Sequence, residues 1–317
     1  MAVITPESFE SLNMNTVKNY LSLVKFSHTI FAMPFAMIGF VLAVRYAPFE
    51  TGTGTFTTTS DFSAANIFVK LLLVIGCMVF ARSAAMAFNR YLDASFDALN
   101  PRTAIREIPA GIISSSSALR FVILNCIAFI ICTALINTVC LILAPVALFV
   151  ILFYSYTKRF TPLCHLVLGV GLSLAPIGAY LAVTGQFDVL PVLFSFTVIF
   201  WVSGFDIIYA MQDVDFDRSQ SLYSIPAYFG KSKALRISEL LHLLSIITVV
   251  YAGVYAGLGT WYWIGTGVFI SMLIYQHSIV KPHDLRKVNL AFMTANGIAS
   301  VVFAVFVIMD LLLPAGN

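Results

Sequence analysis

The chain has 317 residues, of which 60% are hydrophobic and 10% charged, and its net charge is only +3. Soluble domains carry about 25% charged residues, so the composition excludes a soluble protein and offers no strongly basic surface for nucleic acid. The apolar residues fall in blocks of about 18 to 25, the length that crosses about 30 Å of hydrocarbon. They lack the alternation of a β-barrel. We therefore expect an all-α polytopic membrane protein with one domain over residues 1–317.

Residues 1–19 are polar and mixed in charge, which predicts a cytoplasmic segment and no cleaved signal peptide. Basic residues lie almost entirely on one side of the predicted spans, with only Arg45 and Lys70 on the other. The positive-inside rule then places the N-terminus and the loops after the second, fourth, sixth and eighth helices in the cytoplasm, and a bacterial inner membrane is expected. Nine spans are predicted, at residues 26–44, 66–92, 119–137, 139–156, 165–183, 190–211, 237–257, 261–279 and 290–312.

The end of the second predicted helix carries Asn89, Asp93 and Asp97, which recur every four residues. Each step of four turns an α-helix by about 400°, so the three side chains lie on nearly one face. Carboxylates and an amide are hard oxygen ligands that suit Mg²⁺. The motif therefore predicts a cation site at the membrane boundary.

A second acidic motif ends the sixth predicted helix, where Asp213 and Asp217 repeat the first pair of aspartates at an offset of 120 residues. Both motifs are followed by Ile-Pro-Ala, at residues 108–110 and 225–227. This pattern predicts two related halves whose acidic helix ends face a central cavity. Asp206 lies about two turns deeper in the apolar run, where an ionisable residue is costly and usually functional.

Acids that converge on one site repel each other unless positive charge lies between them. Mg²⁺ typically bridges a few carboxylates to substrate phosphates, and basic side chains can supply the remaining phosphate contacts. The alternative is that these acids are solvated loop residues, but six of the fifteen acids gather at two helix ends. We expect these phosphate contacts to come from Arg102, Arg106, Lys158, Arg159 and Arg218.

These motifs resemble the UbiA superfamily of intramembrane aromatic prenyltransferases. The resemblance rests on Asn89-x-x-x-Asp93-x-x-x-Asp97, Asn100-Pro-Arg-Thr-x-x-Arg-x-Ile-Pro, Tyr209-Ala-Met-x-Asp213-x-x-x-Asp217, Lys25-Phe-Ser-His-Thr and Tyr154-Ser-Tyr-Thr-Lys158-Arg159. Within the superfamily the chain is most similar to 4-hydroxybenzoate polyprenyltransferases and to the related enzymes of the futalosine route to menaquinone. Arg90 is a departure, because many members have Asp directly after the Asn.

The resemblance implies a Mg²⁺-dependent transfer of a polyprenyl group from its diphosphate to an aromatic acid, 4-hydroxybenzoate or a dihydroxynaphthoate, in ubiquinone or menaquinone biosynthesis. Asp206 would remove the ring proton or orient the acceptor. Arg82 would hold the acceptor carboxylate or brace Asp206, and a salt bridge between packed helices is an equal alternative. The implied metal ligands are Asn89, Asp93, Asp97, Asp213 and Asp217, and the implied diphosphate contacts are Lys25, Tyr154, Ser155 and Lys158, with Arg102, Arg106 and Arg159 nearby. No obligate protein partner is inferred.

Two other functions fit parts of the pattern. A secondary transporter would also have duplicated halves and intramembrane acids, but here the acids lie at one membrane face and only Asp206 is deep. A CDP-alcohol phosphotransferase would carry an Asp-Gly pair followed by Gly-x-x-x-Asp-x-x-x-Asp, which this chain lacks.

Overall fold

The computed structural model describes residues 17–24, 31–46 and 63–313. Within these ranges the chain is helical without β-strands, which confirms the expected fold class, and its one β-bridge joins Lys281 to Asp284. The longer helices are α2 (Met33–Tyr46), α3 (Ala64–Leu92), α5 (Ser115–Ile136), α6 (Thr138–Thr157), α7 (Cys164–Thr184), α8 (Val189–Ala210), α11 (Lys231–Tyr255), α12 (Thr260–Ile279) and α13 (Asn296–Leu312). The shorter ones are residues 17–23, α4 (Ala94–Leu99), α9 (Val214–Ser219) and α10 (Ile225–Phe229).

Seven helical runs of the described chain are long and apolar enough to cross a bilayer, so this is an integral membrane protein. They are α3, α5, α6, α7, residues Val189–Ser219, α11 and residues Leu290–Leu312. Of the remaining long helices, α2 is apolar but has 14 residues, and α12 packs beside α13. Each predicted span overlaps one of these helices, but the count of nine spans stays a prediction.

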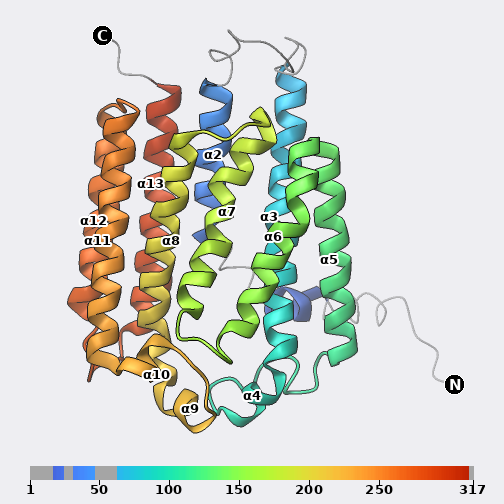
Figure 1. The fold of residues 1–317 in the computed structure, drawn as a ribbon, viewed down its shortest axis with the longest axis vertical. Coiled ribbons are helices and arrows are strands. Elements are labelled where there is room, and N and C mark those ends of the chain that lie inside the picture. Colours follow the sequence, from blue (N-terminus) through green and yellow to red (C-terminus); the bar gives the residue numbers. More distant parts are fainter. Residues whose placement is uncertain (1–16, 25–30, 47–62, 314–317) are drawn as a thin grey trace, which may run out of the picture.

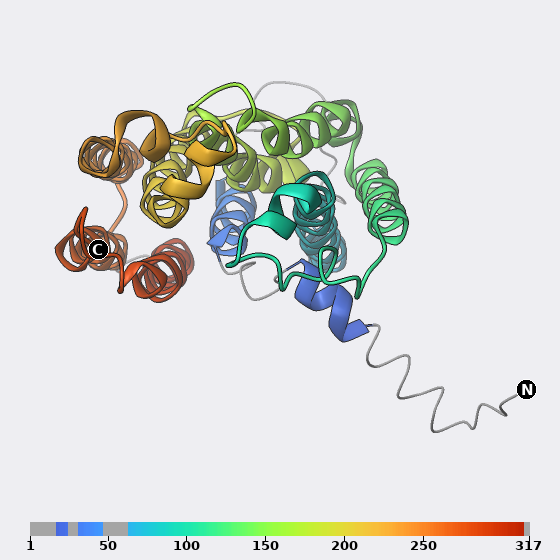
Figure 2. The ribbon, with the colours of Figure 1, turned by 90° about the horizontal axis from the view of Figure 1, so that it is seen from below.

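The long helices stand side by side, and α4, α9 and α10 gather at one end of the bundle (Figure 1). Seen from that end, the α4 and α9–α10 segments lie across the helix ends (Figure 2). Helix α7 packs against α2, α6 and α8, and α8 also packs against α11. The two motif-bearing helices, α3 and α8, both end on this side of the bundle. Together with α6 and α7 they surround one space there.

The core between α2, α8 and α13 is aromatic and contains Phe35, Trp201 and Phe303, all fully buried. The indole Nε1 of Trp201 donates to the Oδ1 of Asn296 at 2.9 Å, which satisfies the buried donor. Helices α2 and α7 cross closely at Gly39, where a Cβ atom would overlap the backbone oxygen of Pro176. Only glycine fits at this crossing.

Helix boundaries differ from the predicted ones where polar residues continue a helix or interrupt it. Helix α11 begins at Lys231, six residues before the predicted start, directly after Gly230 with φ +82°. Helix α8 ends at Ala210, where a 3-10 turn (Met211–Asp213) replaces the α-helix. Hydropathy detects neither change, because it reports apolar length rather than backbone hydrogen bonding. Lys25, at the predicted start of the first helix, lies outside the described residues.

Candidate active site

The two acidic motifs share a local backbone design. Helix α3 ends at Leu92 and α4 begins at Ala94, so Asp93 lies at the junction with φ −89° and ψ 6°. Asp213 lies at the equivalent junction with φ −102° and ψ 6°, directly before α9. The bounds of α4 and α9 differ by 120 residues at both ends, the offset found in the sequence. The local repeat therefore holds in three dimensions, while a division of the whole chain into two related halves stays a prediction.

The helical register of the first motif continues across the junction between α3 and α4. The backbone N–H of Asp93 donates to the oxygen of Asn89 at 2.9 Å, and that of Asp97 donates to the oxygen of Asp93 at 2.7 Å. The Nδ2 of Asn89 donates to the Oδ2 of Asp93 at 3.1 Å. These backbone bonds continue the helical register, so Asn89, Asp93 and Asp97 lie on nearly one face, as their spacing predicts.

Each acid of the first motif is paired with an arginine. The Nη1 of Arg106, in the loop after α4, lies 2.7 Å from both oxygens of Asp97. The Nη2 of Arg159, just beyond α6, donates to the Oδ1 of Asp93 at 2.9 Å. Burial raises the pKa of Asp93 above its ordinary value, although the positive charge of Arg159 opposes this.

The second motif takes its cations from the first half of the chain. The Nε of Arg102 donates to the Oδ1 of Asp213 at 3.0 Å, and the Nδ2 of Asn100 approaches the same oxygen at 3.4 Å. The Nζ of Lys158 lies 2.7 Å from the Oδ1 of Asp217, which is completely buried. Burial alone would lower the pKa of Lys158, but Asp217 more than offsets this and holds it above its ordinary value.

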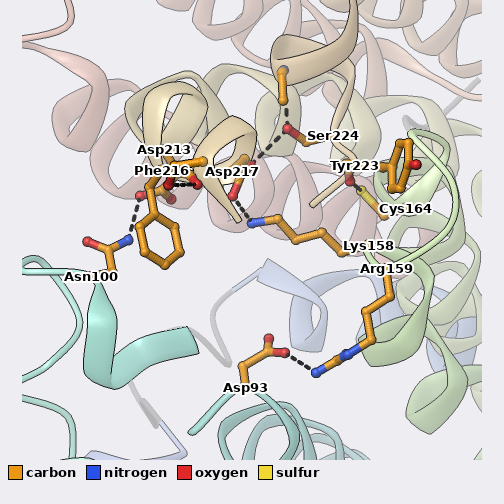
Figure 3. Close-up of polar contacts among 12 residues, drawn as sticks. Asp93, Asn100, Lys158, Arg159, Cys164, Asp213, Phe216, Asp217, Tyr223 and Ser224 are labelled. Carbon is orange, nitrogen blue, oxygen red and sulfur yellow. Dashed lines mark hydrogen bonds and ion pairs between the residues drawn. The ribbon is translucent and has the colours of Figure 1, made fainter. Parts of the chain in front are cut away.

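Lys158 and Arg159 connect the two motifs. They are adjacent in sequence, yet Lys158 points to Asp217 of the second motif and Arg159 to Asp93 of the first (Figure 3). The hydroxyl of Ser224 also donates to the Oδ2 of Asp217 at 2.9 Å. The end of α6 therefore lies between the two acidic helix ends and supplies one cation to each.

These side chains line a cavity of about 640 Å³ at the end of the bundle. Arg218 does not line it, because its Nε donates to the backbone oxygen of Ala227 at 2.9 Å, so its expected phosphate contact is not supported. The other predicted site residues that the structure describes all line the cavity: Arg82, Asn89, Asp93, Asp97, Arg102, Arg106, Tyr154, Ser155, Lys158, Arg159, Asp206, Asp213 and Asp217. Asp215, between the two acids of the second motif, is exposed and does not line it. Asp213 and Asp217 therefore face the cavity, whereas Asp215, two residues from each, faces solvent.

The described lining of this cavity contains six acids and six arginine or lysine side chains. Four acids pair with the arginines and lysine described above, and a fifth, Glu107, lies 3.7 Å from Arg90. The sixth, Asp206, pairs with His165. Arg82 is therefore the one lysine or arginine of the described lining without an acid partner, and its buried Nε has no hydrogen-bond partner there. Neither the brace to Asp206 nor the interhelical salt bridge considered for Arg82 is observed.

Two side-chain pairs in the cavity lining were not predicted from the sequence. Arg90 is only 4% exposed, and it faces Glu107, which also accepts a hydrogen bond from the hydroxyl of Ser22. Arg90 therefore sits where a buried acid from another segment compensates its charge. His165 is 2% exposed at the start of α7 and lies 2.7 Å from Asp206. Neither pairing leaves a local signal, because the partners lie 17 and 41 residues apart in the sequence.

An apolar pocket of about 340 Å³ adjoins the polar cavity and lies between α3, α5, α6 and α7. Five residues line both spaces: Arg82, Met86, Tyr154, Leu168 and Leu172. Arg82, which has no acid partner among the described residues, therefore lies where the charged cavity meets the apolar pocket. A ligand with a charged head and a long apolar tail would match the two spaces together.

The chemistry of the donors suits Mg²⁺, since four carboxylates and an amide are hard oxygen ligands. Their arrangement pairs the carboxylates with cations, and no three acidic, histidine or cysteine side chains of the described chain converge closely enough to hold a metal ion. A Mg²⁺–diphosphate would offer phosphate oxygens to the same arginines and lysine while the acids turn to the metal. The residues therefore fit a Mg²⁺–diphosphate, whose metal and phosphate oxygens would replace the present ion-pair partners.

Comparison with known proteins matches residues 32–298 to the model of the UbiA prenyltransferase family. The 4-hydroxybenzoate octaprenyltransferase of Aeromonas salmonicida (strain A449) is 29% identical over 250 residues, which cover 78% of this chain and 85% of that protein. An apo structure of a UbiA homologue from Aeropyrum pernix K1 is 30% identical with a TM-score of 0.73, covering 90% of this chain and 97% of that one. A UbiA homologue from Archaeoglobus fulgidus bound to GPP and Mg²⁺ shares the fold at 17% identity, with a TM-score of 0.69 and coverages of 93% and 100%.

Proposed function

Because the chain belongs to the UbiA prenyltransferase family, we propose that it transfers a polyprenyl group from a polyprenyl diphosphate to an aromatic acid with the help of Mg²⁺. The chain is a prenyltransferase, as the family resemblance in its sequence predicted, and the transporter and phosphotransferase alternatives are set aside. The proposal concerns its substrates, its metal and the roles of its residues.

The observation that carries this proposal is the position of Arg82. A charge-balanced cavity leaves this one guanidinium unpaired within the described lining, at the border with the apolar pocket. An aromatic acid has the matching form, because its carboxylate would pair with Arg82 while its ring stays among apolar side chains. The relatives' name supports 4-hydroxybenzoate as the acid, and a dihydroxynaphthoate offers the same carboxylate and an electron-rich ring.

The diphosphate is proposed to bind between the two acidic motifs. Asn89, Asp93, Asp97, Asp213 and Asp217 would hold Mg²⁺, which would act as a Lewis acid on the diphosphate leaving group. Arg102, Arg106, Lys158 and Arg159 would exchange their carboxylate partners for phosphate oxygens, with Lys25, Tyr154 and Ser155 as further contacts. The prenyl chain would extend into the apolar pocket that adjoins this cavity.

The proposed reaction begins when the allylic C–O bond breaks and the diphosphate leaves with the bonding electrons. Basic side chains near the phosphates stabilise the charge that develops there. A ring carbon of the acceptor then forms the new C–C bond, and the ring proton passes to Asp206. Asp206 precedes Asp213 by seven positions, and Arg82 precedes Asn89 by seven. At about 1.5 Å per residue both lie about 10 Å deeper than the motifs, so they can address one acceptor below the diphosphate.

The site is proposed to face the cytoplasm of a bacterial cell, at its inner membrane, and to make a quinone precursor. The end of the bundle with α4, α9 and α10 also carries the basic loops, which the positive-inside rule assigns to the cytoplasm. A soluble aromatic acid and a released diphosphate would then exchange with the cytoplasm, while the prenyl chain stays in the bilayer.

The test is an assay of membranes that contain the protein, supplied with Mg²⁺, a labelled polyprenyl diphosphate and either 4-hydroxybenzoate or a dihydroxynaphthoate. We expect diphosphate release and a prenylated acid with the wild type, and loss of both in Asp93→Asn and Asp213→Asn. Asp215→Asn is the matched control, because that acid lies in the second motif but outside the cavity. If the wild type turned over neither aromatic acid, the proposed activity would be refuted. An active Asp213→Asn variant would place the metal elsewhere.

A second variant tests the acceptor site separately. Arg82→Met removes one charge-assisted contact, worth about 1.5–3 kcal/mol, so the KM for the aromatic acid should rise roughly 10- to 100-fold. The KM for the prenyl diphosphate should change little, because Arg82 pairs with none of the motif acids. An equal rise in both constants would show that Arg82 does not bind the acceptor.

A further inference from the structure

His165 has no role in the chemistry proposed above, yet it pairs with Asp206 at the wall of the polar cavity. The Nδ1 of His165 lies 2.7 Å from the Oδ2 of Asp206. The histidine is 2% exposed, whereas the aspartate side chain is about a quarter exposed and lines the polar cavity. Asp206 forms no ion pair with an arginine or lysine in the described chain. Its environment is therefore set by one imidazole on the protein side and by the cavity on the other.

A second contact indicates which nitrogen of that imidazole donates to Asp206. The backbone N–H of Ile225 donates to the Nε2 of His165 at 3.3 Å, so Nε2 acts as an acceptor and carries no proton. A neutral histidine then has its proton on Nδ1, and a protonated one would set two N–H groups against each other. The Nδ1–H of His165 therefore donates to the Oδ2 of Asp206.

The same contact connects Asp206 to the second acidic motif. Ile225 begins α10, and Ser224 before it donates to the Oδ2 of Asp217. On the other side, the hydroxyl of Ser203 donates to the backbone oxygen of His165 at 3.1 Å. His165 is therefore held on both sides, and the loop that fixes its ring also holds an acid of the second motif.

We infer that His165 is a positioning residue, whose Nδ1–H aims the carboxylate of Asp206 at the ring proton of the aromatic acceptor. This inference rests on the proposed function. In the step concerned, the C–H bond at the newly prenylated ring carbon breaks, its electrons restore the aromatic ring and the proton goes to Asp206. The imidazole does not take this proton, because Ile225 occupies Nε2 and Nδ1 is already protonated. Asp206 is thereby a base rather than a group that only orients the acceptor.

Two substitutions of His165 distinguish the roles of its Nδ1 and Nε2 atoms. The amide of Asn reaches about as far as Nδ1 of histidine and can donate to Asp206, whereas the longer Gln places its amide near Nε2. We expect His165→Gln to lower kcat at least tenfold with little change in the KM for the prenyl diphosphate, and His165→Asn to recover most of that loss. A purely structural role would give equal losses in both variants.

The decisive measurement uses acceptor deuterated at the ring carbons next to the hydroxyl group. When the base is misplaced, proton removal becomes slower than the preceding steps, so the isotope effect on kcat should be larger in His165→Gln than in the wild type. Asp206→Asn should show the same increase, and it provides the test should His165→Gln fail to fold. A slow variant without an increased isotope effect would overturn the inference. A wild type that makes no prenylated acid would instead refute the proposed function.

Discussion

Glu107 provides the sharpest test of how the cavity is held together. Its Oε2 lies 3.7 Å from the Nη1 of Arg90, and the two residues are only 8% and 4% exposed. Both atoms are buried without a hydrogen-bond partner in the described chain, so charge alone connects them. Glu107→Leu would leave the guanidinium of Arg90 buried and unpaired.

The expected cost follows from that geometry. Removing one partner of a buried ion pair costs about 3–5 kcal/mol, and the long contact places this pair near the lower end. Loss of the hydrogen bond from Ser22 adds about 1 kcal/mol. At roughly 2 °C per kcal/mol for a chain of this size, the unfolding midpoint of Glu107→Leu should fall by about 8 °C.

The assay is thermal unfolding of the purified protein in detergent, with a double variant as the control. Replacing both charges by apolar groups is often neutral, so Arg90→Met with Glu107→Leu should recover most of the lost midpoint. The loop that contains Glu107 also carries Arg102 and Arg106, so the KM for the prenyl diphosphate should rise in the single variant and fall back in the double. Additive losses in the double variant, or a shift below about 2 °C in Glu107→Leu, would refute the reasoning.

Three further predictions concern other parts of the molecule. Gly39→Ala should destabilise the protein by about 2–3 kcal/mol, because the added Cβ meets the backbone of Pro176, whereas Gly178→Ala has open space and should be neutral or slightly stabilising in thermal unfolding. Lys158→Met leaves the buried carboxylate of Asp217 without its cation, so both the unfolding midpoint and the affinity for prenyl diphosphate should fall. Lys233→Met, at an exposed lysine, should change neither, and equal effects of the two variants would contradict the pairing of Lys158 with Asp217. Chelation with EDTA should stop turnover but leave the unfolding midpoint nearly unchanged, because basic side chains already neutralise the four motif acids; a large drop would show a structural metal.

The sequence determined the helical bundle because hydropathy is a local property. Twenty consecutive apolar residues can satisfy their backbone in a bilayer only as a helix, so the length of each block predicts a helix without knowledge of its neighbours. The four-residue spacing of Asn89, Asp93 and Asp97 likewise predicts a shared face, and the backbone bonds across the α3–α4 junction keep it. The 120-residue offset marked the second motif, and the same offset separates the bounds of α4 and α9.

The partners of these residues were decided by the tertiary structure alone. Arg102 and Asp213 are 111 residues apart, and Lys158 and Asp217 are 59 apart, so no periodicity connects them. The sequence shows which basic residues accompany the acids, but it does not show which acid each of them pairs with. Among the described residues Arg82 has no acid partner, because His165 pairs with Asp206 and Glu107 lies beside Arg90. Both contacts depend on how α7 and the loop after α4 pack in space. Charge balance in a buried cavity is a property of the packed helices, since the cost of an unpaired charge appears only once water is excluded.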